Sequence, residues 1–168
     1  MEKTIDFIFE LLKSFLISIV VVVLIINFIA IPVRVSGSSM YPNLHEGDFG
    51  FSGVFTRALG YKRFDVVVLE NDATQQKIVK RIIGLPNEKV EYKNSQLYIN
   101  DEAVEEDFLG EDIFTNNFVV ELGDDEYFCL GDNREVSQDS RYYGPFSSKD
   151  IVAKSILVLY PFSDMGIY

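Results

Sequence analysis

Cysteine is nearly absent from this chain of 168 residues, and positive charge is in short supply. The single cysteine, Cys129, cannot form an internal disulfide, and it lies in an apolar run where cysteine behaves as a small hydrophobic residue. Fifteen lysines and arginines stand against 26 aspartates and glutamates, and no basic cluster is present. Because proteins bind nucleic acids mainly by neutralising phosphates with Lys and Arg, this balance argues against a nucleic-acid partner.

Charge is absent altogether from residues 14–33. About twenty apolar residues are enough to span a bilayer as a helix. A cleavable signal peptide would have a shorter apolar core of ~7–15 residues and would end in a small-x-small site, whereas here the bulky Phe28 stands two positions before Ala30, where a small residue is required, and Pro32 follows. The sequence therefore predicts a short tail at residues 1–13, an uncleaved transmembrane anchor at 14–33, and one domain of modest size at 34–168.

Beyond the anchor the chain alternates short runs of β-branched and aromatic residues with turn residues, and no repeat or long linker interrupts it. We expect strands at residues 64–69, 77–84, 88–92, 96–99, 126–130 and 153–160, with the third and fourth joined as a hairpin. The domain is thus predicted to be mainly β. Residues 49–55 fit either a core strand or an apolar surface that meets the bilayer.

The most acidic part of the chain, residues 101–126, carries eleven carboxylates and no lysine or arginine. These carboxylates lack the glycine-punctuated spacing of a calcium loop, which favours a solvated surface. We therefore expect neither a metal site nor a cofactor.

A turn of small residues follows directly on the apolar run. Gly37 and its neighbours let the backbone approach a ligand with its N–H groups exposed, and Pro42 prevents the segment from continuing as a helix or a central strand. Such a turn can present one hydroxyl, and we interpret Ser39 as a nucleophile. On this stretch alone an ordinary Ser/Gly turn remains an alternative.

Three boxes in order along the chain resemble those of the type I signal peptidases, the Ser/Lys proteases that remove secretory signal peptides. The first box, residues 37–42, reads Gly-Ser-Ser-Met-Tyr-Pro, and the second, residues 80–86, reads Lys-Arg-Ile-Ile-Gly-Leu-Pro. The third box, residues 131–141, reads Gly-Asp-Asn-Arg-Glu-Val-Ser-Gln-Asp-Ser-Arg. The resemblance covers nearly the whole chain and is sparse only at residues 91–125, which by this resemblance form a small acidic excursion inserted into the catalytic domain.

The second box supplies a candidate base. A serine hydroxyl is a poor nucleophile until a neighbouring base takes its proton, and a lysine can do so only when it is neutral. Burial among apolar groups lowers the pKa of a lysine from its free value of ~10.4. In a strand, Lys80 shares a face with Ile78 and Ile82, so we interpret it as the general base that serves Ser39.

The third box supplies support. The resemblance implies that Ser137 hydrogen-bonds the Lys80 amine and orients it, while Asp139 and Arg141 form an ion pair. A carboxylate beside the amine would raise the pKa of the lysine. We therefore expect Asp139 to engage Arg141 rather than Lys80.

The first box departs from the family pattern in two ways. Some family members add a serine hydroxyl to the oxyanion hole at the position of Gly37, so here the hole must depend on backbone donors, chiefly the N–H of Ser39. Met40 completes this box, and Asn43 stands where the family commonly has threonine.

By resemblance, the protein is a membrane-bound serine endopeptidase that removes signal peptides from exported precursors after small-x-small sites such as Ala-x-Ala. Its partners would be these precursors and the lipid bilayer. Its amino terminus would be cytoplasmic and its catalytic domain extracytoplasmic, a topology that the few flanking charges, Lys3 and Lys13 against Arg34, do not decide alone.

Three alternatives stay open. A Ser/His/Asp hydrolase would use His45, the single histidine. A self-cleaving, repressor-like Ser/Lys protease would lack the anchor and carry a DNA-binding domain. A catalytically inactive anchored β domain would bind exported chains, although the intact Ser39 and Lys80 argue against it.

Overall fold

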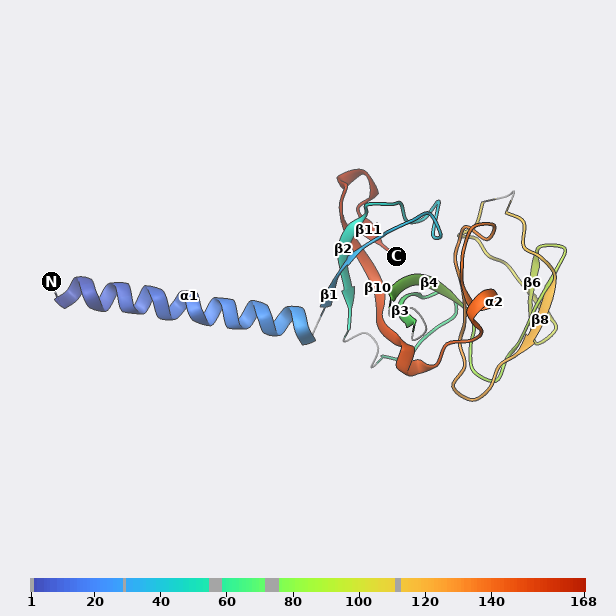
Figure 1. The fold of residues 1–168 in the computed structure, drawn as a ribbon, viewed down its shortest axis with the longest axis horizontal. Coiled ribbons are helices and arrows are strands. Elements are labelled where there is room, and N and C mark those ends of the chain that lie inside the picture. The colour runs from blue at the N-terminus through green and yellow to red at the C-terminus, as the bar shows by residue number, and fades with distance from the viewer. Residues whose placement is uncertain (1, 29, 55–58, 72–75, 111–112) are drawn as a thin grey trace.

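The computed structural model describes residues 2–28, 30–54, 59–71, 76–110 and 113–168. Its first element is the helix α1 (Glu2–Phe28), which extends away from the β-rich body (Figure 1). By length and composition, Ile5–Leu24 can cross a membrane, and the body buries none of these residues. A helix that exposes so many apolar side chains suits lipid better than water.

The helix ends earlier than the predicted anchor of residues 14–33. Helical structure also covers residues 2–13, and α1 stops at Phe28. The end of the predicted anchor was wrong, because Ala30–Arg34 form the strand β1, in which Val33 is buried in the protein core. Pro32 cannot donate a ladder hydrogen bond, and β1 accordingly lies at the edge of its sheet.

The main sheet is antiparallel, with the order β1-β2-β10-β3-β4-β9 and with β11 beside β10. After β1 its strands are β2 (Phe49–Gly53), β3 (Val66–Asn71), β4 (Gln76–Gly84), β9 (Phe128–Leu130), β10 (Ile151–Tyr160) and β11 (Gly166–Ile167). Short helical turns precede and follow β10, namely α2 (Ser140–Tyr143), η2 (Ser148–Asp150) and η3 (Phe162–Asp164). The prediction of a mainly β domain is confirmed.

A second, smaller sheet has the order β7-β6-β5-β8 and lies at the end of the molecule remote from α1 (Figure 1). Its strands are β5 (Lys89–Lys93), β6 (Gln96–Ile99), β7 (Glu102–Val104) and β8 (Phe118–Glu121). The predicted hairpin is present, because β5 pairs with β6 in register from Val90 and Ile99 to Lys93 and Gln96. The acidic excursion is therefore a sheet of its own, and it begins two residues earlier than expected.

Consecutive residues of β3 enter two different apolar clusters. Val66 and Val68 join one cluster, whereas Val67 and Leu69 join another that contains Ile82. The main sheet is thus buried on both faces at β3, which explains why four apolar residues follow one another from Val66 to Leu69 instead of alternating with polar ones. A polar side chain from the buried half of β4, residues 80–84, consequently enters an apolar environment whichever way it points.

Candidate active site

Ser39 and Lys80 lie in direct contact. Lys80 Nζ is 2.9 Å from Ser39 Oγ and donates a second hydrogen bond, of 3.0 Å, to the carbonyl oxygen of Val79. Lys80 stands opposite Val67 across β3 and β4, on the face that also carries Ile82. Only 3% of the lysine is exposed to solvent. The two residues that sequence reasoning paired are therefore brought together from positions 41 residues apart.

The segment that carries Ser39, residues 36–48, is here called the serine loop. Gly37 turns the backbone with a φ of 80°, in the left-handed region where a side chain is disfavoured. Directly after Ser39 the loop is anchored, because Met40 and Leu44 are buried in the core and the Leu44 N–H donates to the Met40 carbonyl at 2.9 Å. Ser39 is thus held between a glycine turn and two buried side chains.

The third box touches Ser39 through the backbone. The N–H of Asn133 donates to the Ser39 carbonyl at 3.0 Å. A Cβ at Gly131 would collide with that same carbonyl and with Ser137. Glycine is therefore needed at position 131 because two chain segments meet there, although its φ is unexceptional.

The environment of Lys80 favours the neutral amine. Burial lowers its pKa from 10.5 to about 8, while the charges of Asp139 and Asp132 raise it and that of Arg141 lowers it. At neutral pH an appreciable fraction of this lysine is uncharged and can accept a proton from the hydroxyl that it contacts.

Asp139 engages Arg141. Both carboxylate oxygens accept hydrogen bonds from the guanidinium, at 2.8 Å each, and Oδ2 also accepts the Gly131 N–H at 3.0 Å. Burial opposes the ionisation of Asp139, but these hydrogen bonds outweigh it and keep the pKa of this carboxyl below its usual range. Arg141 also donates a hydrogen bond to the Arg134 carbonyl at 2.7 Å, so the ion pair links two parts of the third box.

The expected hydrogen bond from Ser137 to Lys80 is absent from the described part of the chain. The second hydrogen bond from Lys80 goes to the Val79 carbonyl instead. The buried Ser137 hydroxyl lies against Gly131 and has no hydrogen-bond partner among the described residues, although it lies close enough to Asp139 to help lower the pKa of that carboxyl. Ser137 therefore affects Lys80 only indirectly, through the ion pair of Asp139 and Arg141.

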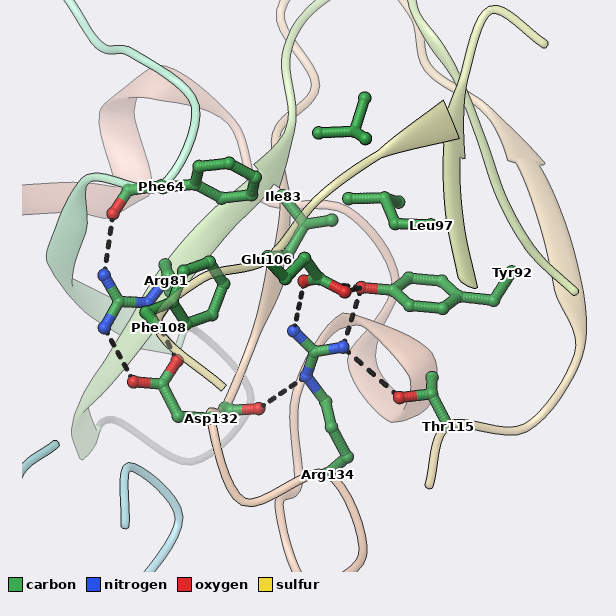
Figure 2. A network of polar contacts seen from close by, with 12 residues as sticks. Phe64, Arg81, Ile83, Tyr92, Leu97, Glu106, Phe108, Thr115, Asp132 and Arg134 are labelled. Atoms are coloured by element: carbon green, nitrogen blue, oxygen red, sulfur yellow. Dashed lines mark hydrogen bonds and ion pairs between the residues drawn. The ribbon is translucent and has the colours of Figure 1, made fainter. Parts of the chain in front are cut away.

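Sequence reasoning missed a buried ion pair beside the site. Arg81 donates to both carboxylate oxygens of Asp132, at 2.8 and 2.7 Å, and its guanidinium stacks on the Phe108 ring at 4.1 Å (Figure 2). Asn43 donates to the same carboxylate and to the Phe108 carbonyl, each at 2.9 Å. The residue that replaces the family's usual threonine thus joins the serine loop to the third box and to the excursion.

A second buried pair holds the excursion from the other side. The Arg134 side chain is fully buried and donates to Glu106 at 2.6 Å and to the Tyr92 hydroxyl at 2.7 Å (Figure 2). Glu106 was expected on a solvated acidic surface, but only 8% of its side chain is exposed. The acidic run contains no basic residue that could have revealed this partner.

His45 does not contact Ser39 within the described part of the chain. Its Nδ1 lies 3.3 Å from Asp164 Oδ2, and its ring packs edge-on against Tyr41. The geometry gives no support to a Ser/His/Asp arrangement.

A serine hydroxyl held against a buried lysine, on an antiparallel β fold that follows an apolar helix, is an arrangement compatible with a serine peptidase of the Ser/Lys type. Residues 8–160 match the family model described as signal peptidase, peptidase S26. The chain belongs to this family of peptidases.

Individual relatives agree with the family model. Signal peptidase I S of Bacillus subtilis (strain 168) is 43% identical, over 94% of this chain and 92% of its own length. A signal peptidase I of Bacillus amyloliquefaciens is 39% identical, over 91% of this chain and 88% of its own. The crystal structure of a signal peptidase I from Enterococcus faecalis V583 superposes with a TM-score of 0.51 at 32% identity, covering 59% of this chain and 96% of that one.

Proposed function

We propose that this chain is a membrane-anchored signal peptidase I that cleaves exported precursors after small-x-small sites, with Ser39 as nucleophile and Lys80 as general base. The observation that carries the proposal is the 2.9 Å contact between Lys80 Nζ and Ser39 Oγ, made by a lysine that is almost completely buried. Membership in the signal peptidase family supports the substrate class.

The chemistry follows from the contact. Neutral Lys80 takes the proton of the Ser39 hydroxyl as Oγ attacks the scissile carbonyl carbon, and it then returns this proton to the leaving amine. The resulting acyl-enzyme ester is hydrolysed by water, with Lys80 again the base. The backbone N–H of Ser39 is the first candidate donor to the developing oxyanion.

The supporting residues keep Lys80 in its active form. Arg141 pairs with Asp139, so this buried carboxylate raises the pKa of the lysine less than an unpaired one would. Ser137 supports Asp139, and Gly131 lets the third box approach the backbone of Ser39. In this proposal these four residues act on the position or protonation of the two catalytic residues without touching the substrate.

The proposed topology places the amino terminus in the cytoplasm, the span within α1, and the β domain on the extracytoplasmic side. Large apolar side chains are exposed on β2 and around the end of β10, namely Phe49, Tyr160, Phe162, Met165 and Ile167. Such a patch fits contact with the bilayer surface. β2 also buries Ser52 and Gly50, which supports the core-strand interpretation of residues 49–55, while the exposed Phe49 is compatible with contact of the other face with the bilayer; residue 55 lies outside the described residues.

The test is cleavage of a precursor with one Ala-x-Ala site by the full chain in phospholipid vesicles, with the new amino terminus identified by mass spectrometry. Ser39→Ala and Lys80→Ala should each abolish cleavage in a folded protein, and the double variant should be no worse than either. Activity of Lys80→Ala within about tenfold of wild type would exclude the Ser/Lys assignment.

Two further arms refine the test. A precursor with a bulky residue in place of the alanine before the cut should be spared, and cleavage at an unrelated bond would refute the specificity. A catalytically inactive binding domain predicts a different outcome, in which the wild type binds the precursor without releasing a product.

A further inference from the structure

Three potential metal ligands meet where the serine loop touches the carboxyl-terminal segment. His45 and Asp48 belong to the loop, and Asp164 ends the helical turn η3. Each offers one ligand atom, and these atoms all lie within 4.8 Å of one another. Asp164 is more than a hundred residues from the other two, so no local sequence pattern could have shown the cluster.

Asp48 is the unusual member of this group. Only 1% of the residue is exposed, and Oδ2 accepts the His45 backbone N–H at 2.8 Å. Oδ1 is buried and has no hydrogen-bond partner among the residues that the structure describes. A buried carboxylate is costly unless a cation or several donors compensate it, and buried charges in proteins are typically paired or coordinate metals.

The side chain of His45 also points into this cluster, and one of its ring nitrogens also has no hydrogen-bond partner among the described residues. Its Nδ1 is buried and lies 3.3 Å from Asp164 Oδ2, yet the two atoms lack the geometry of a hydrogen bond. Two ligands of one tetrahedral zinc ion, each about 2.0–2.2 Å from the metal, lie about 3.4 Å apart. The observed separation therefore suits two ligands of a shared ion, and the ligand atom of Asp48 lies within 4.8 Å of both.

We propose that His45, Asp48 and Asp164 bind one divalent transition-metal cation of the Zn²⁺ type. An imidazole nitrogen favours Zn²⁺ and related ions, whereas Ca²⁺ and Mg²⁺ prefer sites made only of oxygen. The charge of the cation balances the two carboxylates. The cation joins the serine loop to the carboxyl-terminal segment, so its role is structural and it takes no part in proton transfer.

The experiment uses the full chain in detergent micelles at pH 7.5, without a polyhistidine tag and after treatment with a chelator. Equilibrium dialysis against micromolar Zn²⁺, followed by elemental analysis, should find about one ion per chain. The same concentration of Ca²⁺ should not displace it. At a hundredfold excess over its dissociation constant, Zn²⁺ should raise Tm by about 5–10 °C.

His45→Ala and Asp164→Asn should each abolish binding and the rise in Tm. Glu46→Gln is the matched control, because it removes an exposed charge from the same loop and should leave both unchanged. Retention of the ion by both ligand variants would overturn the proposal, as would absence of wild-type binding at about 100 µM free Zn²⁺. Neither readout involves turnover, so the result is independent of the proposed peptidase activity.

Discussion

The ion pair of Asp139 and Arg141 gives a sharp test of the lysine base. At pH 7 a lysine with a pKa of about 8 is neutral in about one molecule in eleven, whereas at 10.5 it would be neutral in about one in three thousand. The rate should therefore depend steeply on any change in this pKa. In the wild type, kcat/KM for a peptide substrate should rise about tenfold per pH unit below pH 8 and level off above it.

Arg141→Met should move this limb to higher pH. The change removes a positive charge that lowers the pKa of Lys80, and it leaves the Asp139 carboxylate, which raises that pKa, without its partner. Both effects favour the protonated, inactive amine. A shift of about one unit would lower kcat/KM about tenfold at pH 7, and most of the loss should be recovered by pH 10.

The control for this shift is Arg63→Met. Arg63 matches Arg141 closely, because its side chain is also 21% exposed, pairs with a carboxylate, Glu88, and donates to a backbone carbonyl. It is not among the charges that act on Lys80. Both variants should lose stability, but only Arg141→Met should shift the limb. An unchanged or more acidic limb in Arg141→Met, with chemistry rate-limiting, would refute the reasoning.

Three other variants test the packing around the site. Lys80→Met should abolish cleavage. It should also raise the free energy of unfolding by about 1–3 kcal/mol at pH 7, measured by chemical denaturation, because it removes an amine whose burial is unfavourable. A loss of stability would contradict this. Gly131→Ala should lower kcat at least about tenfold, since the added Cβ displaces the Ser39 carbonyl. Gly110→Ala is the control and should leave kcat unchanged, because a Cβ there meets no other atom. Equal kcat values for the two variants would argue against the contact. Glu106→Ala should lower the free energy of unfolding by about 3–5 kcal/mol, because the buried guanidinium of Arg134 loses its charge partner. A loss below about 1 kcal/mol would show that water replaces the carboxylate.

Features specified by neighbouring residues were predictable from the sequence. The hairpin of β5 and β6 follows from β-branched runs on either side of a turn, and the structure confirms it. The contact of Ser39 with Lys80 was accessible only because two local boxes resemble a family, since nothing in the spacing of 41 residues brings them together.

Features specified by distant contacts were not predictable. Glu106 looked like one of many solvated carboxylates, and only the folded chain provides Arg134 to pair with it. The boundary between α1 and β1 was misplaced because membrane helices and buried strands draw on the same β-branched residues. The hydrogen bond expected from Ser137 rested on resemblance alone, and here the Val79 carbonyl takes its place.

The neighbours Lys80 and Arg81 on β4 point to opposite faces of one strand, where they meet a hydroxyl and a carboxylate respectively. The alternation of the strand thus sorts two basic groups into one that can lose its charge and one that keeps it. If β4 slipped by one residue against β3, the guanidinium would face Ser39 and the amine would face Asp132. An arginine cannot act as a base, and an amine beside a carboxylate stays protonated. Such a slipped chain would be inert and would also bury a guanidinium without its carboxylate, so the register of β4 against β3 determines both activity and stability.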